Sequence, residues 1–283
     1  MPAKTVTVHT RRRRGKRGAG WMVAALILLL CAYLWIGAPA ITRGTEAPPS
    51  PTAQAAMGAQ ANPAKSAPRV TEDIRFEELR LYAIEFGTYE TIEAARVEAA
   101  RYVQRGAAGY VYASSGEYRV LGAGYASREE ADKVLGQLAD GEGIAARVTE
   151  VSAQPVLLRV TASQAQIEAL REAEETLREA TEQMGAASFA IDKSEVSYAE
   201  AAYRIEMLSG RVAASRENLN AQAGAHPNAV VTGLSGAMEA FEYGARDATA
   251  DPQQAALAFS SKLKYSYLNT RIAHISFLNA LNG

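Results

Sequence analysis

The side chains that most often carry out catalysis are few in this 283-residue chain and do not form a known constellation. Its three histidines, His9, His226 and His274, make no His-Glu-x-x-His pair of the kind that binds zinc. No Gly-x-Ser-x-Gly or Ser-x-x-Lys arrangement lies where a nucleophile needs it, and glycine-rich phosphate loops are absent. Adjacent carboxylates such as Glu129-Glu130 fit solvated helix surfaces. We therefore expect no enzyme, no metal site and no cofactor.

Charge is distributed unevenly along the chain. The first 20 residues carry seven basic side chains and no acidic one, which leaves 23 basic against 31 acidic side chains in the rest. Counterion release on nucleic acid needs clustered Lys and Arg. An acidic body therefore argues against a nucleic-acid partner.

An apolar segment follows the basic residues, and no charged side chain occurs between Arg17 and Arg43. About 20 apolar residues cross the hydrocarbon core of a bilayer, and preceding positive charge keeps the N-terminus in the cytoplasm. The pattern predicts a basic cytoplasmic tail (1–20), a signal anchor (21–41) and extracytoplasmic domains beyond it. The expected location is the cell membrane, with a single pass. A cleaved signal peptide is the alternative, because Ala38-Pro39-Ala40 resembles a cleavage site.

The only cysteine, Cys31, lies inside this apolar segment, so the exported body has no thiol for a disulfide or a metal. Residues 42–72 contain half of the ten prolines and almost no large apolar side chain. Such a composition cannot bury enough surface to order itself. It predicts a flexible linker between the membrane and a first folded domain at 73–154.

Residues 79–151 show the signals of alternating strands and helices. "LRLYAIEF" reads as a strand whose better core face is Tyr82, Ile84 and Phe86. A helix fits Thr91 to about Gln104, followed by two strands joined at Ser115-Gly116. Ser127 and Glu130 form a capping box for a second helix, and "IAARVTEV" is the last strand.

The resulting order is β-α-β-β-α-β, an α+β fold with an antiparallel four-stranded sheet and two helices on one face. The motif Tyr-x-Thr/Ser-x-Glu-x-Ala occurs at Tyr89 and again at Tyr125, as expected for two related halves. The opposite sheet face is predicted to be bare, which makes it a platform for a ligand. RNA-binding domains share this topology but need aromatic pairs on a basic sheet, and these are lacking here.

This unit resembles the SPOR (sporulation-related repeat) domain in "YAIEFGTY", in the alanine-rich helix after it and in "EYRVLGAGYASREEADKVLGQL". The resemblance implies non-catalytic binding of peptidoglycan, with preference for glycan strands stripped of peptides, at division or sporulation septa. The ligand-binding residues that it implies are Glu85, Arg119, Leu121, Tyr89 and Tyr125. The family usually has Gln at the place of Glu85, and Gly-Pro-aromatic where this chain has Ala123-Gly124-Tyr125.

Three of these residues have alternative roles. Arg119 is expected on the open face, where it pairs either with a glycan carboxylate or with Glu85 on the neighbouring strand. Tyr89 and Tyr125 are either core residues at the corners or ligand contacts. A carboxylate at position 85 cannot donate a hydrogen bond and would repel a glycan carboxylate.

Residues 155–283 read as helical after one further extended segment, "VLLRV". Leu170, Leu177, Met184 and Ile191 recur every seventh residue, and three more amphipathic stretches follow. Short loops favour a four-helix bundle, and self-association as a coiled coil is the alternative. The bundle is expected to recruit a protein partner or to mediate assembly. A scaffold in which sheet and bundle only contact proteins, without binding glycan, is the alternative function.

Overall fold

The computed structural model describes residues 68–142, 144–224 and 228–282. The basic tail, the predicted signal anchor and the predicted linker up to residue 67 lie outside the described residues. Within the part of the chain that is described, no helix is both long and apolar enough to cross a membrane. The described residues fall into a single compact unit.

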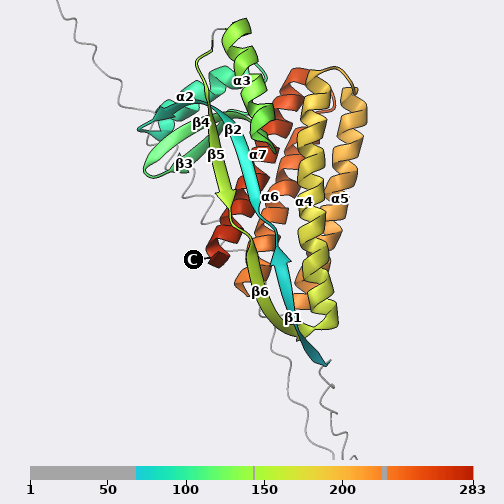
Figure 1. The fold of residues 1–283 in the computed structure, drawn as a ribbon. Helices are drawn as coiled ribbons and strands as arrows, with labels where there is room; N and C mark the ends of the chain where they lie inside the picture. Colours follow the sequence, from blue (N-terminus) through green and yellow to red (C-terminus); the bar gives the residue numbers. More distant parts are fainter. Residues whose placement is uncertain (1–67, 143, 225–227, 283) are drawn as a thin grey trace, which may run out of the picture. The chain divides into compact units, whose positions relative to one another are not determined.

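A four-stranded sheet and two helices make up the first half of this unit (Figure 1). The order along the chain is β2 (Leu79–Tyr89), α2 (Ile92–Val103), β3 (Tyr110–Ser114), β4 (Glu117–Tyr125), α3 (Arg128–Glu142) and β5 (Arg147–Ala153). In the sheet the strands follow the order β3-β4-β2-β5, and all pairs are antiparallel. This arrangement confirms the predicted β-α-β-β-α-β order.

Local signals explain where these elements begin and turn. The hydroxyl of Thr91 accepts a hydrogen bond from the amide of Ala94 at 3.2 Å, and Ser127 does the same for Glu130 at 3.2 Å. Each bond satisfies an amide that a helix start leaves unpaired. Ser115 and Gly116 have φ values of 54° and 81°, as the tight turn between β3 and β4 requires.

An antiparallel ribbon precedes and follows the sheet, and its first strand is not predicted from the sequence. β1 (Arg69–Phe76) pairs with β6 (Val156–Ser163) over eight residue pairs. β1 begins inside the range assigned to the linker, which therefore ends before residue 69. The alternation of Ile74 and Phe76, both buried, with exposed polar residues marks it as a strand. The proline-rich composition of residues 42–72 led to the whole range being predicted as a linker, so the short alternation in β1 was missed.

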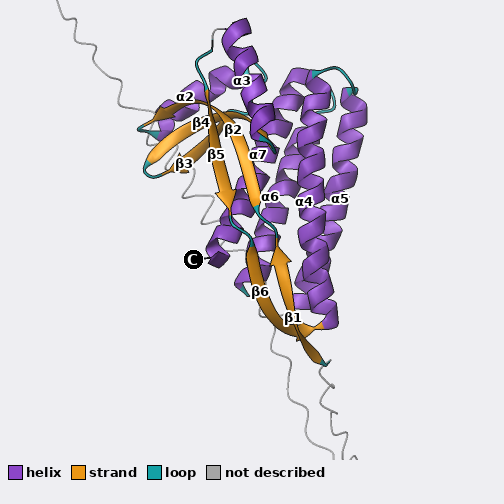
Figure 2. Cartoon of the chain, in the orientation of Figure 1, coloured by secondary structure: helices purple, strands orange, loops and turns teal. Residues whose placement is uncertain are grey.

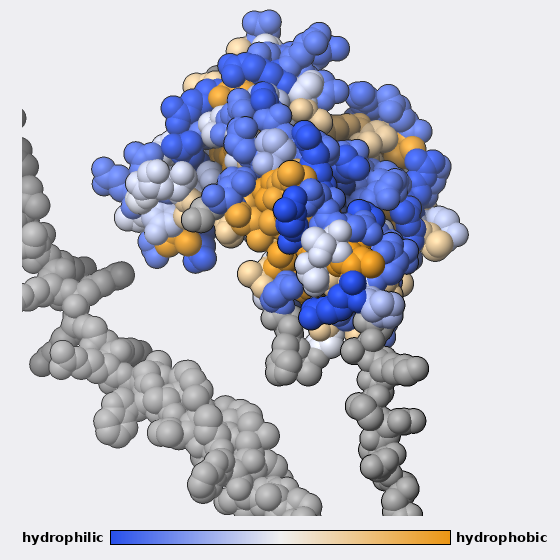
Figure 3. Space-filling model, turned by 60° about the horizontal axis from the view of Figure 1, so that its bottom comes forward, coloured by the Kyte–Doolittle hydropathy of each residue, from blue (hydrophilic) through white to orange (hydrophobic). Residues whose placement is uncertain are grey.

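The ribbon buries one face against the helices and exposes the other. Leu157 is an exposed apolar side chain on the outer face, and Val70 is exposed at the open end of the inner face. The view that brings the bottom of the unit forward shows apolar residues gathered near its middle (Figure 3).

Four long helices form the second half, as Figure 2 shows. They are α4 (Gln164–Asp192), α5 (Tyr198–Ala223), α6 (Ala229–Thr249) and α7 (Ala256–Asn282), and each packs against its sequence neighbours while α7 closes the ring on α4. The heptad residues Leu170, Leu177, Met184 and Ile191 are buried inside the bundle. These side chains therefore pack against the other helices of the same chain. This favours the four-helix bundle over a coiled coil formed through these positions.

The sheet face predicted to be bare is largely covered by α7. Leu79, Leu81 and Leu121 share one continuous core with Leu263 and Leu268 of α7. The prediction is wrong here because β2 is apolar on both faces: Tyr82 and Ile84 pack toward α3, and Leu79 and Leu81 toward α7. A strand with two apolar faces must be covered on both sides.

Five hydrogen bonds fasten α7 to the backbone of the sheet domain. Ser261 and Lys264 donate to the carbonyl oxygens of Ala107 and Gly106 at 2.6 and 2.8 Å. Three more, from Arg271, Asn279 and Asn282, reach carbonyl oxygens of Arg80, Ser152 and Gln154. Sheet and bundle therefore form one packed body rather than two domains joined at residue 155.

Candidate functional site

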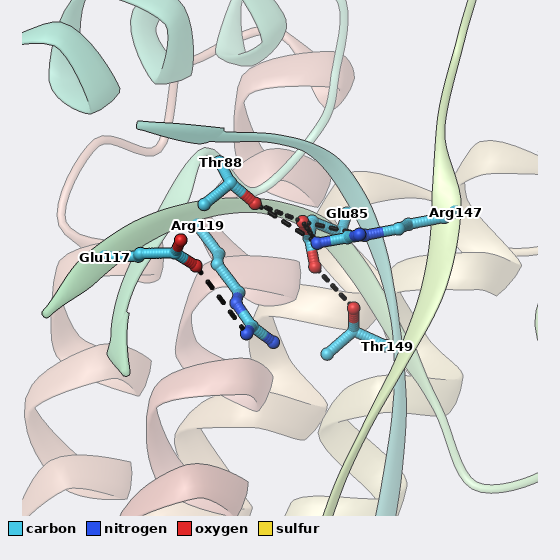
Figure 4. A network of polar contacts seen from close by, with 6 residues as sticks. All are labelled: Glu85, Thr88, Glu117, Arg119, Arg147 and Thr149. Atoms are coloured by element: carbon cyan, nitrogen blue, oxygen red, sulfur yellow. Dashed lines mark hydrogen bonds and ion pairs between the residues drawn. The ribbon is translucent and has the colours of Figure 1, made fainter. Parts of the chain in front are cut away.

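One corner of the sheet carries the polar side chains that α7 leaves uncovered (Figure 4). Glu85 and Thr88 come from β2, Arg119 from β4, and Arg147 and Thr149 from β5. With Glu117 of β4, two guanidinium groups and two carboxylates thus lie on neighbouring strands of the same face.

Glu85 is the buried member of this group, with only 1% of its surface exposed. Arg147 donates to its Oε1 from Nε at 3.0 Å and from Nη2 at 2.5 Å, Thr88 donates to the same oxygen at 2.8 Å, and Thr149 donates to Oε2. Burial opposes ionisation, but the bonds from Arg147, Thr149 and Thr88 outweigh it, so the pKa of Glu85 lies below its usual value. The carboxylate is ionised, neutralised and withdrawn from solvent.

Arg119 does not pair with Glu85, contrary to one of its predicted roles. In the strand register Arg119 lies opposite Thr88, whereas Glu85 lies opposite Leu121 and Arg147. The nearest carboxylate to Arg119 is Glu117, whose Oε2 is 4.0 Å from Nη2. At that distance the attraction between partly exposed charges is weak.

The Arg119 side chain is 25% exposed, and its Nε is buried without a hydrogen-bond partner. A guanidinium offers five donors in a planar fork that suits a carboxylate. Arg119 therefore retains donors for a ligand, whereas Nε and Nη2 of Arg147 are used on Glu85.

One tyrosine adjoins Arg119, and two more lie further along the same side of the sheet. Tyr112 lies opposite Arg119 in the register of β3 and β4, and Tyr110 is two residues before it. The ring of Tyr265 from α7 packs on Tyr110 with centroids 5.2 Å apart. Burial, with smaller effects of Tyr265 and Tyr112, raises the pKa of Tyr110 to about 12.

Tyr265 is a candidate that sequence reasoning missed, and 44% of its surface is exposed. It belongs to the helical region, 155 positions after Tyr110, and only the docking of α7 brings the two rings together. No signal in the sequence could have placed it at this corner.

The other three predicted site residues lie elsewhere. Leu121 is on the same face but fully buried beneath α7. Tyr125 is on the face covered by α2 and α3. There its ring stacks on Phe189 with centroids 5.0 Å apart, and burial raises its pKa. Tyr89 is half buried on the α2 side. The structure thus brings together Glu85 and Arg119 but places both tyrosines on the opposite face of the sheet.

The comparison with known families settles what this sheet and its two helices are. Residues 79–150 match the family model of the SPOR domain. These residues are a SPOR domain. The match ends before the helical region, and neither a curated protein nor a solved structure matches the chain at a significant level. SPOR domains are generally non-catalytic and bind peptidoglycan in cell-division proteins.

Residues with catalytic potential at the edge of the SPOR domain serve structural roles. Ser261 and Lys264 have the Ser-x-x-Lys spacing, but both donate to backbone carbonyls of the loop at 106–107. Lys264 also lies 2.6 Å from Asp192, which accepts a hydrogen bond from Ser260. Among the described residues, no group of three metal-ligating side chains comes together.

Proposed function

We propose that this protein binds the glycan strands of peptidoglycan without catalysis, through the uncovered corner of its SPOR domain. The observation that carries the proposal is Arg119, a partly exposed cation with unused donors opposite Tyr112, with the Tyr110–Tyr265 ring pair further along the same face. Sugar rings present apolar faces to aromatic side chains, and the acidic sugar of a glycan strand supplies a carboxylate for a guanidinium.

The covering of the sheet limits what can bind. Because α7 occupies the part of the face nearest Leu121, the platform is a corner rather than the whole sheet. We infer a contact with a short stretch of glycan that lacks stem peptides, since bulky peptides would meet α7 and its neighbours.

The cellular setting belongs to the same proposal. The basic tail and apolar segment before the described residues support a single-pass protein with a cytoplasmic N-terminus and an extracytoplasmic SPOR domain. Its place of action would be the division or sporulation septum. A fluorescent fusion should collect at septa, and a fusion that lacks residues 1–41 should lose its attachment to the membrane fraction.

Sedimentation with amidase-treated sacculi tests the glycan contact. Residues 68–283 should pellet with the sacculi, and Arg119→Gln should lower the bound fraction severalfold, as expected for a charge-assisted bidentate contact. Arg159→Gln is the matched control, because Arg159 pairs with Asp73 on the outer face of the ribbon. Pelleting no greater than that of an unrelated protein would refute glycan binding.

A scaffold that binds proteins alone is the second candidate, and one surface favours it. A groove of about 510 Å³ between α4 and α5 is lined by Ala186, Ala187 and Ala190 and flanked by exposed Tyr203 and Met207. Small residues in a groove with aromatic and methionine side chains at its edge suit a helix of a partner. A photo-crosslinker at Tyr203 should capture an envelope protein if the scaffold role holds, and adding Met207→Glu should abolish the capture.

A further inference from the structure

A cleft of about 330 Å³ lies on the side of the SPOR sheet that α2 and α3 cover, opposite the corner with Glu85 and Arg119. Its floor is Ile84, Gly122 and Ala123, where β2 and β4 have an irregular register. Its walls come from the end of α2, from α3 and from the helical region. The volume is at the lower end of the range for small-molecule sites.

Two stacked aromatic pairs line this cleft. Phe86 and Tyr102 stack with centroids 4.0 Å apart and planes 15° apart, and Tyr125 stacks on Phe189 in the same way at 5.0 Å. All four rings line the cleft. Stacked pairs are stiff walls, because neither ring can turn without losing its partner. The slot is therefore preformed for an apolar body.

The charged residues that line the cleft are mostly cationic. They are Arg105, Lys193 and Lys264 against the single carboxylate of Asp192. Lys264 and Asp192 form a partly buried pair at 2.6 Å and so neutralise one another. Lys193 is 67% exposed, and its Nζ is 3.9 Å from Glu195, a pair too long and too solvated to cancel its charge.

We propose that this cleft binds a small molecule that joins an apolar ring or chain to one negatively charged group. The apolar part contacts the two aromatic pairs, and the anionic group faces Lys193. Phe189, Lys193 and Lys264 belong to the helical region, so the site exists only where that region meets the SPOR domain. The proposal is independent of glycan binding, because the cleft and the sheet corner lie on opposite faces of the sheet.

Two dyes with the same apolar body test the apolar contact and the anionic contact separately. 8-Anilinonaphthalene-1-sulfonate is anionic, and N-phenyl-1-naphthylamine lacks the sulfonate. Both should bind residues 68–283, and the anionic dye should bind more tightly. Val134→Phe fills the cleft from α3 and should weaken both dyes at least tenfold, whereas Val97→Phe, on the exposed side of α2, should weaken neither.

The charge is tested by Lys193→Glu, with Arg96→Glu on the outer side of α2 as the control of equal charge change. Lys193→Glu should weaken the sulfonate dye about three- to fivefold, as expected for one exposed charge contact, and leave the neutral dye unchanged. Near-ultraviolet circular dichroism of each variant checks that dye binding does not report unfolding. If Val134→Phe binds each dye as tightly as the wild type does, the proposed site is refuted. Equal weakening of both dyes by Lys193→Glu overturns the anionic specificity.

Discussion

Glu85 stands where SPOR sequences usually have glutamine, and its surroundings explain how a carboxylate is tolerated there. Arg147, Thr88 and Thr149 donate its side-chain hydrogen bonds, and the group is 1% exposed. A buried carboxylate that is paired and hydrogen-bonded stays ionised. The repulsion of a glycan carboxylate expected from the sequence is therefore much reduced, because Arg147 cancels the charge.

Glu85→Gln should destabilise the protein rather than improve glycan binding. The amide leaves Arg147 without its charge partner, and the expected loss in the free energy of unfolding is about 1–3 kcal/mol at pH 7. Urea denaturation measures it. Glu77→Gln, which removes an exposed ion pair with Arg75, should cost less than about 0.5 kcal/mol.

The lowered pKa of Glu85 also predicts a pH dependence. The stabilisation is complete above the ordinary glutamate pKa of about 4.3 and is lost as the pH falls through the lower folded-state value. Denaturation curves between pH 7 and pH 3 should show this acid loss in wild type and a flatter profile in Glu85→Gln. Identical profiles would contradict the assignment.

At the scale of elements, Gly124 of β4 permits the close approach of α7. A Cβ atom added there would lie 2.6 Å from Leu81 and 2.7 Å from Leu268. These contacts are too short for a packed core, so the buried leucine side chains between strand and helix would have to shift. The small residues at this corner of the SPOR domain thus serve helix docking as well as the turn into α3.

Gly124→Ala should lower the free energy of unfolding by about 1–3 kcal/mol, the usual cost of overpacking. Gly136→Ala is the same change inside α3 at a position with open space, and it should be neutral or stabilise by up to about 1 kcal/mol. Thermal melts of both variants make the comparison. Equal melting temperatures would show that α7 does not press on β4.

The elements themselves could largely be predicted, because each has a local cause. Capping residues, the Ser115-Gly116 turn and the heptads of α4 all act within a few residues. β1 was missed because its alternation is short and follows a proline-rich stretch. The candidate site could be predicted less well, because its contacts join segments far apart in the chain. The strand register pairs Glu85 with Arg147, and the docking of α7 brings Tyr265 against Tyr110.

At the scale of the whole molecule, the SPOR domain and the bundle share one hydrophobic core. Leu79, Leu81 and Leu121 would all be exposed if the SPOR domain were cut from the chain. Residues whose burial depends on a second segment fold cooperatively with it. Residues 68–283 are therefore the unit that should be used in binding experiments.

Residues 68–283 should unfold in a single calorimetric transition, with equal calorimetric and van't Hoff enthalpies. Residues 73–155 alone should aggregate or lose near-ultraviolet dichroism, because the face beneath α7 is apolar. Differential scanning calorimetry and sedimentation velocity check the two statements. Two separate transitions in the longer fragment would show that sheet and bundle are independent.

The β1–β6 ribbon has a mechanical consequence. β1 leads directly into β2, and β2 pairs with β4 beside Arg119. If the chain is tethered before residue 68 and a glycan is held at Arg119, tension runs along β1 and β2 and crosses to β4. Antiparallel hydrogen bonds lie perpendicular to the strands. The force is then shared by many hydrogen bonds loaded in shear. We therefore expect the described residues to stay folded under a pulling force between the N-terminal end of β1 and a glycan bound at Arg119.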